Sequence, residues 1–415
     1  PDTVRVGGNA SYTTLATDAT ITLNEQDIGG TVTLSTTGSN AHVQIVNART
    51  LTLNASTIGG NLNVTALTGD LADGGLITVG GNASYTTSGN DATITLDTQD
   101  ITGTVALNTT GTNGNASLAN ATGIDLAASN VGGNLAATAT TGNITDVGTI
   151  TVGGRASYTT SASNATILVN QQAVTGGVSV NTSGALGHAT IVNTAGVLLG
   201  ASNVGGNLSV TAGGAITQNG ALDVDGTTTL SASGHAITLT NTGNDFTGSV
   251  SATGAAVQIT DTNALNAAIT ASGAATLIAG GNLGVSGSAA GLTTTTTAGG
   301  TTAFGTTSVT GNLSTTSAGA VSQGAAQALT VTGTSNVSAS GQTITLTNTG
   351  NNFTGDVTAT GSTIQITDTN ALNAAITASG AATLIAGGNL GVSGSAVGLT
   401  TTTTAGGTTA FGTTS

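Results

Sequence analysis

The residues that could carry chemistry are few, and most change from one repeat of the sequence to the next. The chain has three histidines and no cysteine. His42 and His188 occupy equivalent positions in two copies of a repeat, but the copy between them has Asn115 there. His235 likewise corresponds to Gln342 in a second repeat. Because zinc sites in proteins are built from Cys, His and carboxylate ligands, we interpret these positions as polar turn residues.

The carboxylates follow the same pattern. Glu25 corresponds to Thr98 and Gln171 in the next two copies, and no pair of carboxylates recurs as a pair. A glycosidase needs such a pair, so we expect no enzyme and assign no catalytic, cofactor-binding or metal-binding residue. Asp261–Asn263 does recur as Asp368–Asn370. We interpret both segments as turns, in which Asp and Asn accept backbone hydrogen bonds, and weak calcium binding near Asp261 and Asp368 stays open.

Glycine motifs and aromatic residues are also locked to the repeats. Each Gly-Gly-Asn motif precedes a strand pattern, whereas a dinucleotide-binding fingerprint precedes a helix. The seven aromatic residues fall on only three repeat positions, so we favour a place in the core over a sugar-binding platform: Tyr12, Tyr85 and Tyr158; Phe246 and Phe353; Phe304 and Phe411. The residues that would bind a ligand therefore remain unknown at this level.

Internal repeats organise the whole chain. The segment Val6–Tyr12 recurs at 79–85 and 152–158, so residues 1–222 hold three copies of a 73-residue repeat. Residues 260–308 recur at 367–415 with Val397 for Ala290 as the single change, so residues 223–415 hold nearly two copies of a 107-residue repeat. Self-similarity of this kind is typical of solenoid proteins, in which each turn packs on its neighbours.

Within the repeats, aliphatic residues alternate with threonine. Ala19, Ile21 and Leu23 alternate with Thr20 and Thr22, which is the period of a half-buried strand. We therefore predict an all-β fold, a right-handed parallel β-helix (β-solenoid) with about 20–30 residues per turn that continues from residues 1–222 through 223–415. Equivalent residues of successive 73-residue copies are expected to stack in register.

Composition restricts the class of partner. The chain is 5% charged, with a net charge of −14 and 65 glycines. A nucleic-acid-binding surface needs a basic stripe, which three Lys and Arg residues cannot provide. No run of about 18 apolar residues predicts a transmembrane helix. We expect a thin core of small aliphatic side chains under a polar surface that is mostly uncharged and whose few charges are mainly acidic, which argues against anionic polysaccharides as direct partners.

The Gly-Gly-Asn-Leu run at 205–208 and the Ile-Thr-Leu-Thr-Asn-Thr-Gly-Asn runs at 237–244 and 344–351 resemble the shaft repeats of filamentous-haemagglutinin-like adhesins of two-partner secretion systems. Within that family the repeats are most similar to biofilm-matrix adhesins that bind exopolysaccharide. The resemblance implies a secreted protein on the surface or in the extracellular matrix of a Gram-negative bacterium, exported by an outer-membrane transporter.

The implied function is cell–cell and cell–matrix adhesion and biofilm formation, with neutral exopolysaccharide or other copies of the chain as partners. No cofactor is expected. Two alternatives stay open. The segment is a pure structural spacer whose binding tip lies elsewhere, or it is an ice-binding solenoid. The second is disfavoured because threonine runs such as 293–297 lack a constant spacing along the chain.

Overall fold

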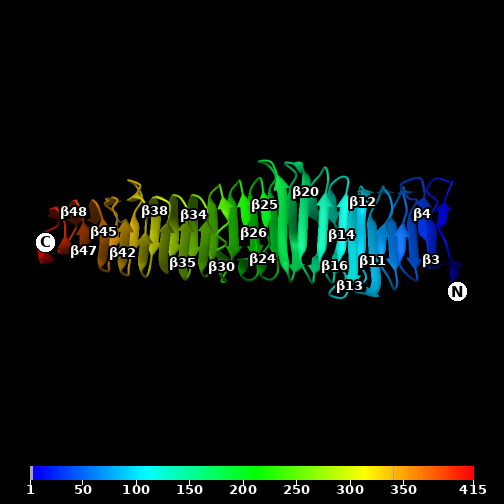
Figure 1. The fold of residues 1–415 in the computed structure, drawn as a ribbon, viewed down its shortest axis with the longest axis horizontal. Helices are drawn as coiled ribbons and strands as arrows, with labels where there is room; N and C mark the ends of the chain where they lie inside the picture. The colour runs from blue at the N-terminus through cyan, green and yellow to red at the C-terminus, as the bar shows by residue number, and fades with distance from the viewer. Residues whose placement is uncertain (1–2, 340) are drawn as a thin grey trace. The chain divides into compact units, whose positions relative to one another are not determined.

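The computed structural model describes residues 3–339 and 341–415. In these ranges the chain forms strands, turns and loops without any helix, and parallel strands stack in about 20 turns of a β-solenoid (Figure 1). The predicted parallel β-helix is thereby confirmed. The chain divides into two compact units, residues 1–213 and 214–415, which are described separately.

Each turn of unit 1 contributes to two sheets, A and B. Sheet A contains β1 (Val4–Val6), β3 (Ile21–Ile28), β5 (Val43–Asn47), β8 (Leu62–Ala66), β11 (Ala83–Asn90), β13 (Thr104–Thr110), β15 (Ile124–Leu126), β16 (Ser129–Val131), β18 (Ile144–Asp146), β19 (Ile150–Val152), β21 (Ile167–Val174), β23 (Ala189–Asn193) and β26 (Leu208–Ala212). Sheet B contains β2 (Ala10–Thr13), β4 (Thr31–Ser35), β6 (Leu51–Leu53), β7 (Ser56–Ile58), β9 (Leu71–Asp73), β10 (Ile77–Val79), β12 (Ile94–Ile101), β14 (Ala116–Asn120), β17 (Leu135–Ala139), β20 (Ala156–Ser163), β22 (Gly177–Ser183), β24 (Val197–Leu199) and β25 (Ser202–Val204).

Unit 2 is built in the same way. Its sheet A contains β29 (Thr228–Ala232), β32 (Val250–Gly254), β34 (Leu265–Ala271), β36 (Leu283–Ala289), β38 (Thr302–Val309), β40 (Val321–Gln323), β41 (Leu329–Val331), β43 (Ile344–Leu346), β44 (Asn352–Phe353), β46 (Ile364–Asp368), β48 (Ala381–Ala386) and β50 (Gly398–Thr403). Its sheet B contains β27 (Ile216–Gln218), β28 (Leu222–Val224), β30 (Ile237–Leu239), β31 (Asp245–Phe246), β33 (Val257–Asp261), β35 (Ala274–Ala279), β37 (Gly291–Thr296), β39 (Leu313–Thr316), β42 (Ser335–Ala339), β45 (Val357–Gly361), β47 (Leu372–Ala378), β49 (Leu390–Ser395) and β51 (Thr409–Thr414).

The turns contain 17 to 23 residues, so the shortest fall below the predicted range of 20–30 and none reaches its upper end. Val250 pairs with Ala267 across a short turn, and Val321 pairs with Ile344 across a long one. Among the described strand pairs, these two mark the extremes of the turn length. The segment from Gly30 to Gly60 is as long as one turn at the upper end of the predicted range, but it crosses one and a half turns.

Successive copies of the 73-residue repeat lie on opposite sheets. Tyr12 is in sheet B, Tyr85 in sheet A and Tyr158 in sheet B again, so one repeat winds through three and a half turns. Tyr85 accordingly stacks between Val64 and Leu107, and not on another tyrosine. The expectation that equivalent residues of successive copies stack in register is therefore wrong. Both sheets accept the same sequence because both pack small aliphatic residues against a shared core.

The 107-residue repeat of unit 2 shows the same offset. The strand β34 lies in sheet A, whereas its copy β47 lies in sheet B, so this repeat winds through five and a half turns. In each unit, equivalent surface residues thus face two opposite directions.

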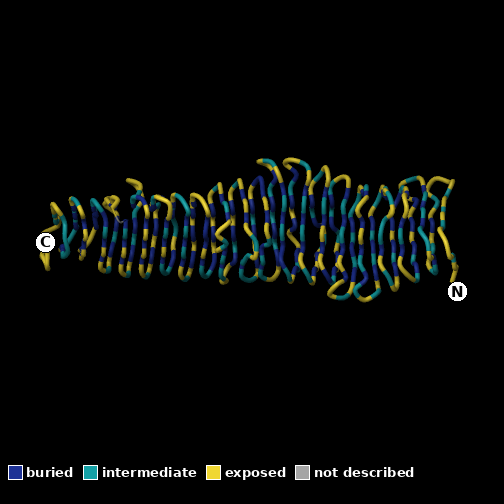
Figure 2. Tube along the Cα trace, in the orientation of Figure 1, coloured by how far each residue is buried: buried dark blue, intermediate teal, exposed yellow. Residues whose placement is uncertain are grey.

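The core of each unit is a column of inward-facing aliphatic residues, and exposed residues alternate with buried ones along every turn (Figure 2). Tyr85 and Tyr158 have no exposed surface, and Phe246, Phe304 and Phe353 are 1% exposed. These five aromatic residues are core residues, as the repeat positions favour. Two others are more exposed because they lie in end strands paired on one side only: Tyr12 in β2, which is half-buried, and Phe411 in β51.

Candidate functional site

The histidines of the 73-residue repeat act as hydrogen-bond acceptors at turns. His42 Nδ1 accepts a hydrogen bond of 2.9 Å from the backbone N–H of Asn61, and His188 Nδ1 accepts an equivalent bond from Asn207. In the middle copy Asn115 Oδ1 takes the same place. All three side chains tie one turn to the next, which is why imidazole and amide replace each other here. The interpretation of His42 and His188 as turn residues is confirmed.

Asp261 and Asp368 form the turns that the sequence predicts, and each leaves one buried oxygen atom. Asp261 Oδ1 accepts a 3.0 Å hydrogen bond from the backbone N–H of Asn263, and Asp368 Oδ1 accepts the same bond from Asn370. Both Oδ2 atoms are buried without a hydrogen-bond partner. Burial raises the pKa of Asp261 to about 6 and also raises the pKa of Asp368. No cluster of three or more His, Cys, Asp or Glu side chains that could hold a metal ion occurs in residues 3–339 and 341–415.

We predict that these two carboxyl groups make the folded state less stable at neutral pH. Folding raises the pKa of both groups, so the stability they provide is present below the unfolded value of about 4 and is lost as pH rises through their higher folded values, which is about 6 for Asp261. In the double variant Asp261→Asn, Asp368→Asn, this loss of stability with rising pH should disappear. The urea midpoint of the whole chain, measured from pH 4 to pH 8, tests it.

Asp91→Asn is the matched control for the loss of negative charge, because Asn164 occupies the equivalent turn position in the next copy. The interpretation fails if the double variant and the unchanged protein show the same dependence of the urea midpoint on pH.

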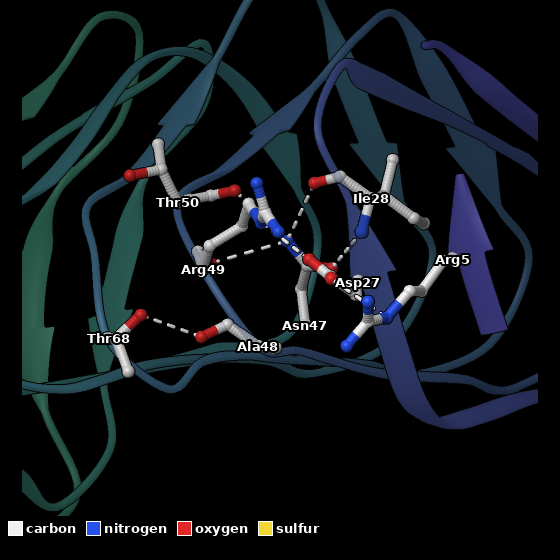
Figure 3. A network of polar contacts seen from close by, with 8 residues as sticks. All are labelled: Arg5, Asp27, Ile28, Asn47, Ala48, Arg49, Thr50 and Thr68. Atoms are coloured by element: carbon white, nitrogen blue, oxygen red, sulfur yellow. Dashed lines mark hydrogen bonds and ion pairs between the residues drawn. The ribbon is translucent and has the colours of Figure 1, made fainter. Parts of the chain in front are cut away.

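Arginine and aspartate form a charged ladder across the first turns of unit 1 (Figure 3). The carboxylate of Asp27 lies between two guanidinium groups, with Arg5 Nε 3.6 Å from Oδ2 and Arg49 Nε 2.5 Å from Oδ1. The Asp27 side chain is 12% exposed, whereas the arginine side chains are 82% and 58% exposed. Because both guanidinium groups face the shared carboxylate of Asp27, we assign the ladder to stabilisation of these turns rather than to anion binding.

Buried amide side chains are the repeat-locked polar residues that the sequence interpretation missed. The Tyr85 hydroxyl donates to Gln99 Oε1 at 2.7 Å, and Gln99 Nε2 donates to Asp73 Oδ2 at 2.6 Å. Tyr158, Gln172 and Asp146 repeat this network in the next copy. Burial raises the pKa of both tyrosines far above the usual range, so their hydroxyls stay protonated donors. The glutamine recurs in every copy of the 73-residue repeat, and this recurrence is the sequence signal that could have indicated the buried network.

A surface groove of about 480 Å³ crosses sheet A of unit 2. Its floor is formed by Gly284, Ala303 and Gly305, and its polar walls include Asn266 and Gln323. None of its lining residues is ionisable. In unit 1, a hollow of about 440 Å³ at the turns near Gly103 includes the carboxylate of Asp125. The unit 2 groove is therefore the better candidate for an uncharged ligand.

Comparison with known proteins gives one family. The family described as repeats of unknown function (DUF5649) matches residues 38–108, 113–182, 186–253 and 290–360, which together cover well over half of the chain. The third match crosses residue 222, and the fourth lies within the 107-residue repeats. No curated protein matches the chain. No solved structure matches it either. No helix among the described residues is long and apolar enough to cross a membrane.

Proposed function

Because this chain belongs to the family of repeats of unknown function (DUF5649), we propose that its repeats form the shaft of a secreted adhesin that mediates cell–cell and cell–matrix adhesion and biofilm formation. The partners are a neutral exopolysaccharide, other copies of the shaft, or both. The similarity of the repeats to filamentous-haemagglutinin-like adhesins supports export through an outer-membrane transporter to the surface of a Gram-negative bacterium. The shaft has no catalytic role in this proposal.

The observation that carries the proposal is the presence of rows of uncharged polar residues on both sheets. On sheet B, Thr138, Thr159, Asn181 and Asn203 lie in register on consecutive turns. Hydroxyl and amide groups can donate to and accept from sugar hydroxyls. Because each such contact replaces one with water, it contributes only about 1 kcal/mol. Repetition along the solenoid supplies the avidity that a single site lacks.

The equivalent row of the preceding copy faces the other way. Thr65, Thr86, Asn108 and Asn130 lie in register on sheet A. The half-turn offset thus presents similar rows in two opposite directions within unit 1. A shaft with two such faces can contact two partners at once, which is what cohesion within an extracellular matrix requires.

Replacement of the repeats tests the proposal against the spacer alternative. In the parent protein, residues 1–415 are exchanged for an unrelated β-solenoid of equal length, and bacterial aggregation is measured with and without the exopolysaccharide. If the shaft binds, aggregation should fall severalfold although the protein still reaches the cell surface. Unchanged aggregation would show that the repeats are only a spacer. Antibody labelling of intact cells is the control for surface display.

A further inference from the structure

The groove on sheet A of unit 2 runs across four consecutive turns. Its central row consists of outward-facing residues in register: Asn266 of β34, Gly284 of β36, Ala303 of β38 and Ser322 of β40. Parallel strands lie about 4.8 Å apart, so the three steps of this row span about 14 Å along the stacking direction. The groove is therefore elongated and follows the stack of turns.

The groove is hollow because side chains are missing in the middle of the row. Gly284 has no side chain, and Ala303 has only a methyl group. A β-bulge lies beside them, since the pairing of β36 with β38 shifts between Val285 and Gly287. Bulges are frequent next to binding sites, where they redirect the strand. A side chain at Gly305 would bring its Cβ to 2.9 Å from Ser286 Cβ.

One wall of the groove is held rigidly. Gln323 Nε2 donates to Asn351 Oδ1 at 2.8 Å, and Asn351 Nδ2 donates back to Gln323 Oε1 at 2.7 Å. Asn351 is fully buried. Gln323 Nε2 also donates to the backbone oxygen of Gln327 at 2.6 Å, which fixes the turn that carries the exposed Gln327 side chain. A preorganised wall loses little side-chain entropy on binding.

The chemistry of the lining selects the class of ligand. Side-chain amides of Asn266 and Gln327 and hydroxyls of Ser286 and Ser322 surround the floor. These groups can both donate and accept hydrogen bonds, and none carries a charge. The backbone groups of the floor strands pair with the neighbouring strands of sheet A, so an extended peptide cannot bind by adding a strand. A polymer rich in uncharged hydroxyl groups fits this groove best.

We infer that this groove binds a few consecutive sugar units of a neutral polysaccharide, with the glycan chain lying along the stack of turns. The inference rests on the proposed adhesive function and assigns it a site. Because no exposed aromatic side chain lines the groove, binding relies on hydrogen bonds alone, and the affinity of one groove is on the order of 1 mM.

The repeat also places the first three positions of this row on the other sheet of unit 2. Asn373, Gly391 and Ala410 lie in register on β47, β49 and β51 of sheet B, and they are the equivalents of Asn266, Gly284 and Ala303. The five-and-a-half-turn repeat thus directs the two rows to opposite sides of unit 2.

Filling the groove tests the inference, and the equivalent row on sheet B is covered in the same variant. The groove variant Ala303→Trp, Ala410→Trp places one indole over the groove floor and one over the sheet B row, without adding a Cβ atom to a glycine. The control variant Ser308→Trp, Ser314→Trp places indoles on exposed residues of β38 and β39 outside the groove. Cellohexaose, mannohexaose and maltohexaose are titrated into each protein and followed by NMR, with hexagalacturonate as the anionic comparison.

At least one neutral hexasaccharide should bind the unchanged protein and the control variant, and its affinity for the groove variant should fall at least tenfold. Gln327→Ala, which removes an exposed wall residue without filling the groove, should weaken binding severalfold and covers the case in which the groove variant fails to fold. Equal affinity in all variants would overturn the assigned site and leave glycan adhesion intact. If no neutral hexasaccharide binds the unchanged protein, both the site and the exopolysaccharide partner are overturned.

Discussion

Replacing Ile94 by aspartate should destabilise unit 1 by about 4 kcal/mol or more, because it buries a charge without a partner. Ile94 is 1% exposed and stacks between Leu71 of the turn before and Ala116 of the turn after. No basic residue lies among these neighbours. The loss should therefore spread to the adjacent turns, since each turn of a solenoid gains its burial from its two neighbours.

The matched control is Thr95→Asp, at the next position along the same strand. Thr95 faces solvent, so its replacement should change the free energy of unfolding by no more than about 0.5 kcal/mol. Circular dichroism melts give the overall loss, and amide hydrogen exchange shows which turns open. Equal losses for the two variants would contradict the assignment of inward and outward residues.

The second large effect is expected at the buried asparagine of the 73-residue repeat. Asn120 Oδ1 accepts a hydrogen bond of 2.9 Å from the backbone N–H of Ile101. Its Nδ2 donates to the backbone oxygens of Ile101 at 3.1 Å and Gly123 at 2.6 Å. Asn47 and Asn193 make the corresponding bonds in the other copies. Asn120→Leu keeps the volume but leaves these backbone groups without their partner.

Each buried group left unpaired costs about 1–3 kcal/mol, so we expect a loss of about 3 kcal/mol for Asn120→Leu. Asn130→Leu, at an exposed position of β16, should be nearly neutral. Urea denaturation of the two variants measures the difference. A similar midpoint for both would show that the Asn120 hydrogen bonds do not hold the turn.

The alternation of residues was enough to predict which side chains point inward. Ile94 and Thr95 follow the period of two, and successive side chains of a strand point to opposite faces. The polar residues of the core did not follow from this rule, because Gln99 and Asn120 are buried although polar residues are usually exposed. Their partners Tyr85, Asp73 and Ile101 lie 14 to 26 residues away, so the network depends on a register that cannot be read from the sequence.

The number of turns in each repeat could not be predicted from the sequence either. The segment from Gly30 to Gly60 has a length that would fit one predicted turn, but sheets A and B have the same residue preferences, so the sequence does not distinguish a whole turn from one and a half. The groove of unit 2 depends on this register as well. Gly284 and Ala303 are separated by a full turn of the chain and become neighbours only once the turn length is known.

The offset of successive copies by half a turn is tested most directly by pairs of spin labels in unit 1. The chain has no cysteine, so labels can be attached at introduced cysteines alone. Thr95 of β12 and Ser117 of β14 pair in register, which predicts labels about 5 Å apart at their attachment points and a strongly broadened electron paramagnetic resonance spectrum. Thr22 of β3 and Thr95 are equivalent residues of successive copies and lie on different sheets, so labels at this pair should give no such broadening. If the repeat wound through three whole turns, Thr22 and Thr95 would lie on one face about 14 Å apart, and their labels would show weak dipolar broadening. Such broadening for the Thr22 and Thr95 pair would contradict the half-turn arrangement and with it the two-faced display of the repeats.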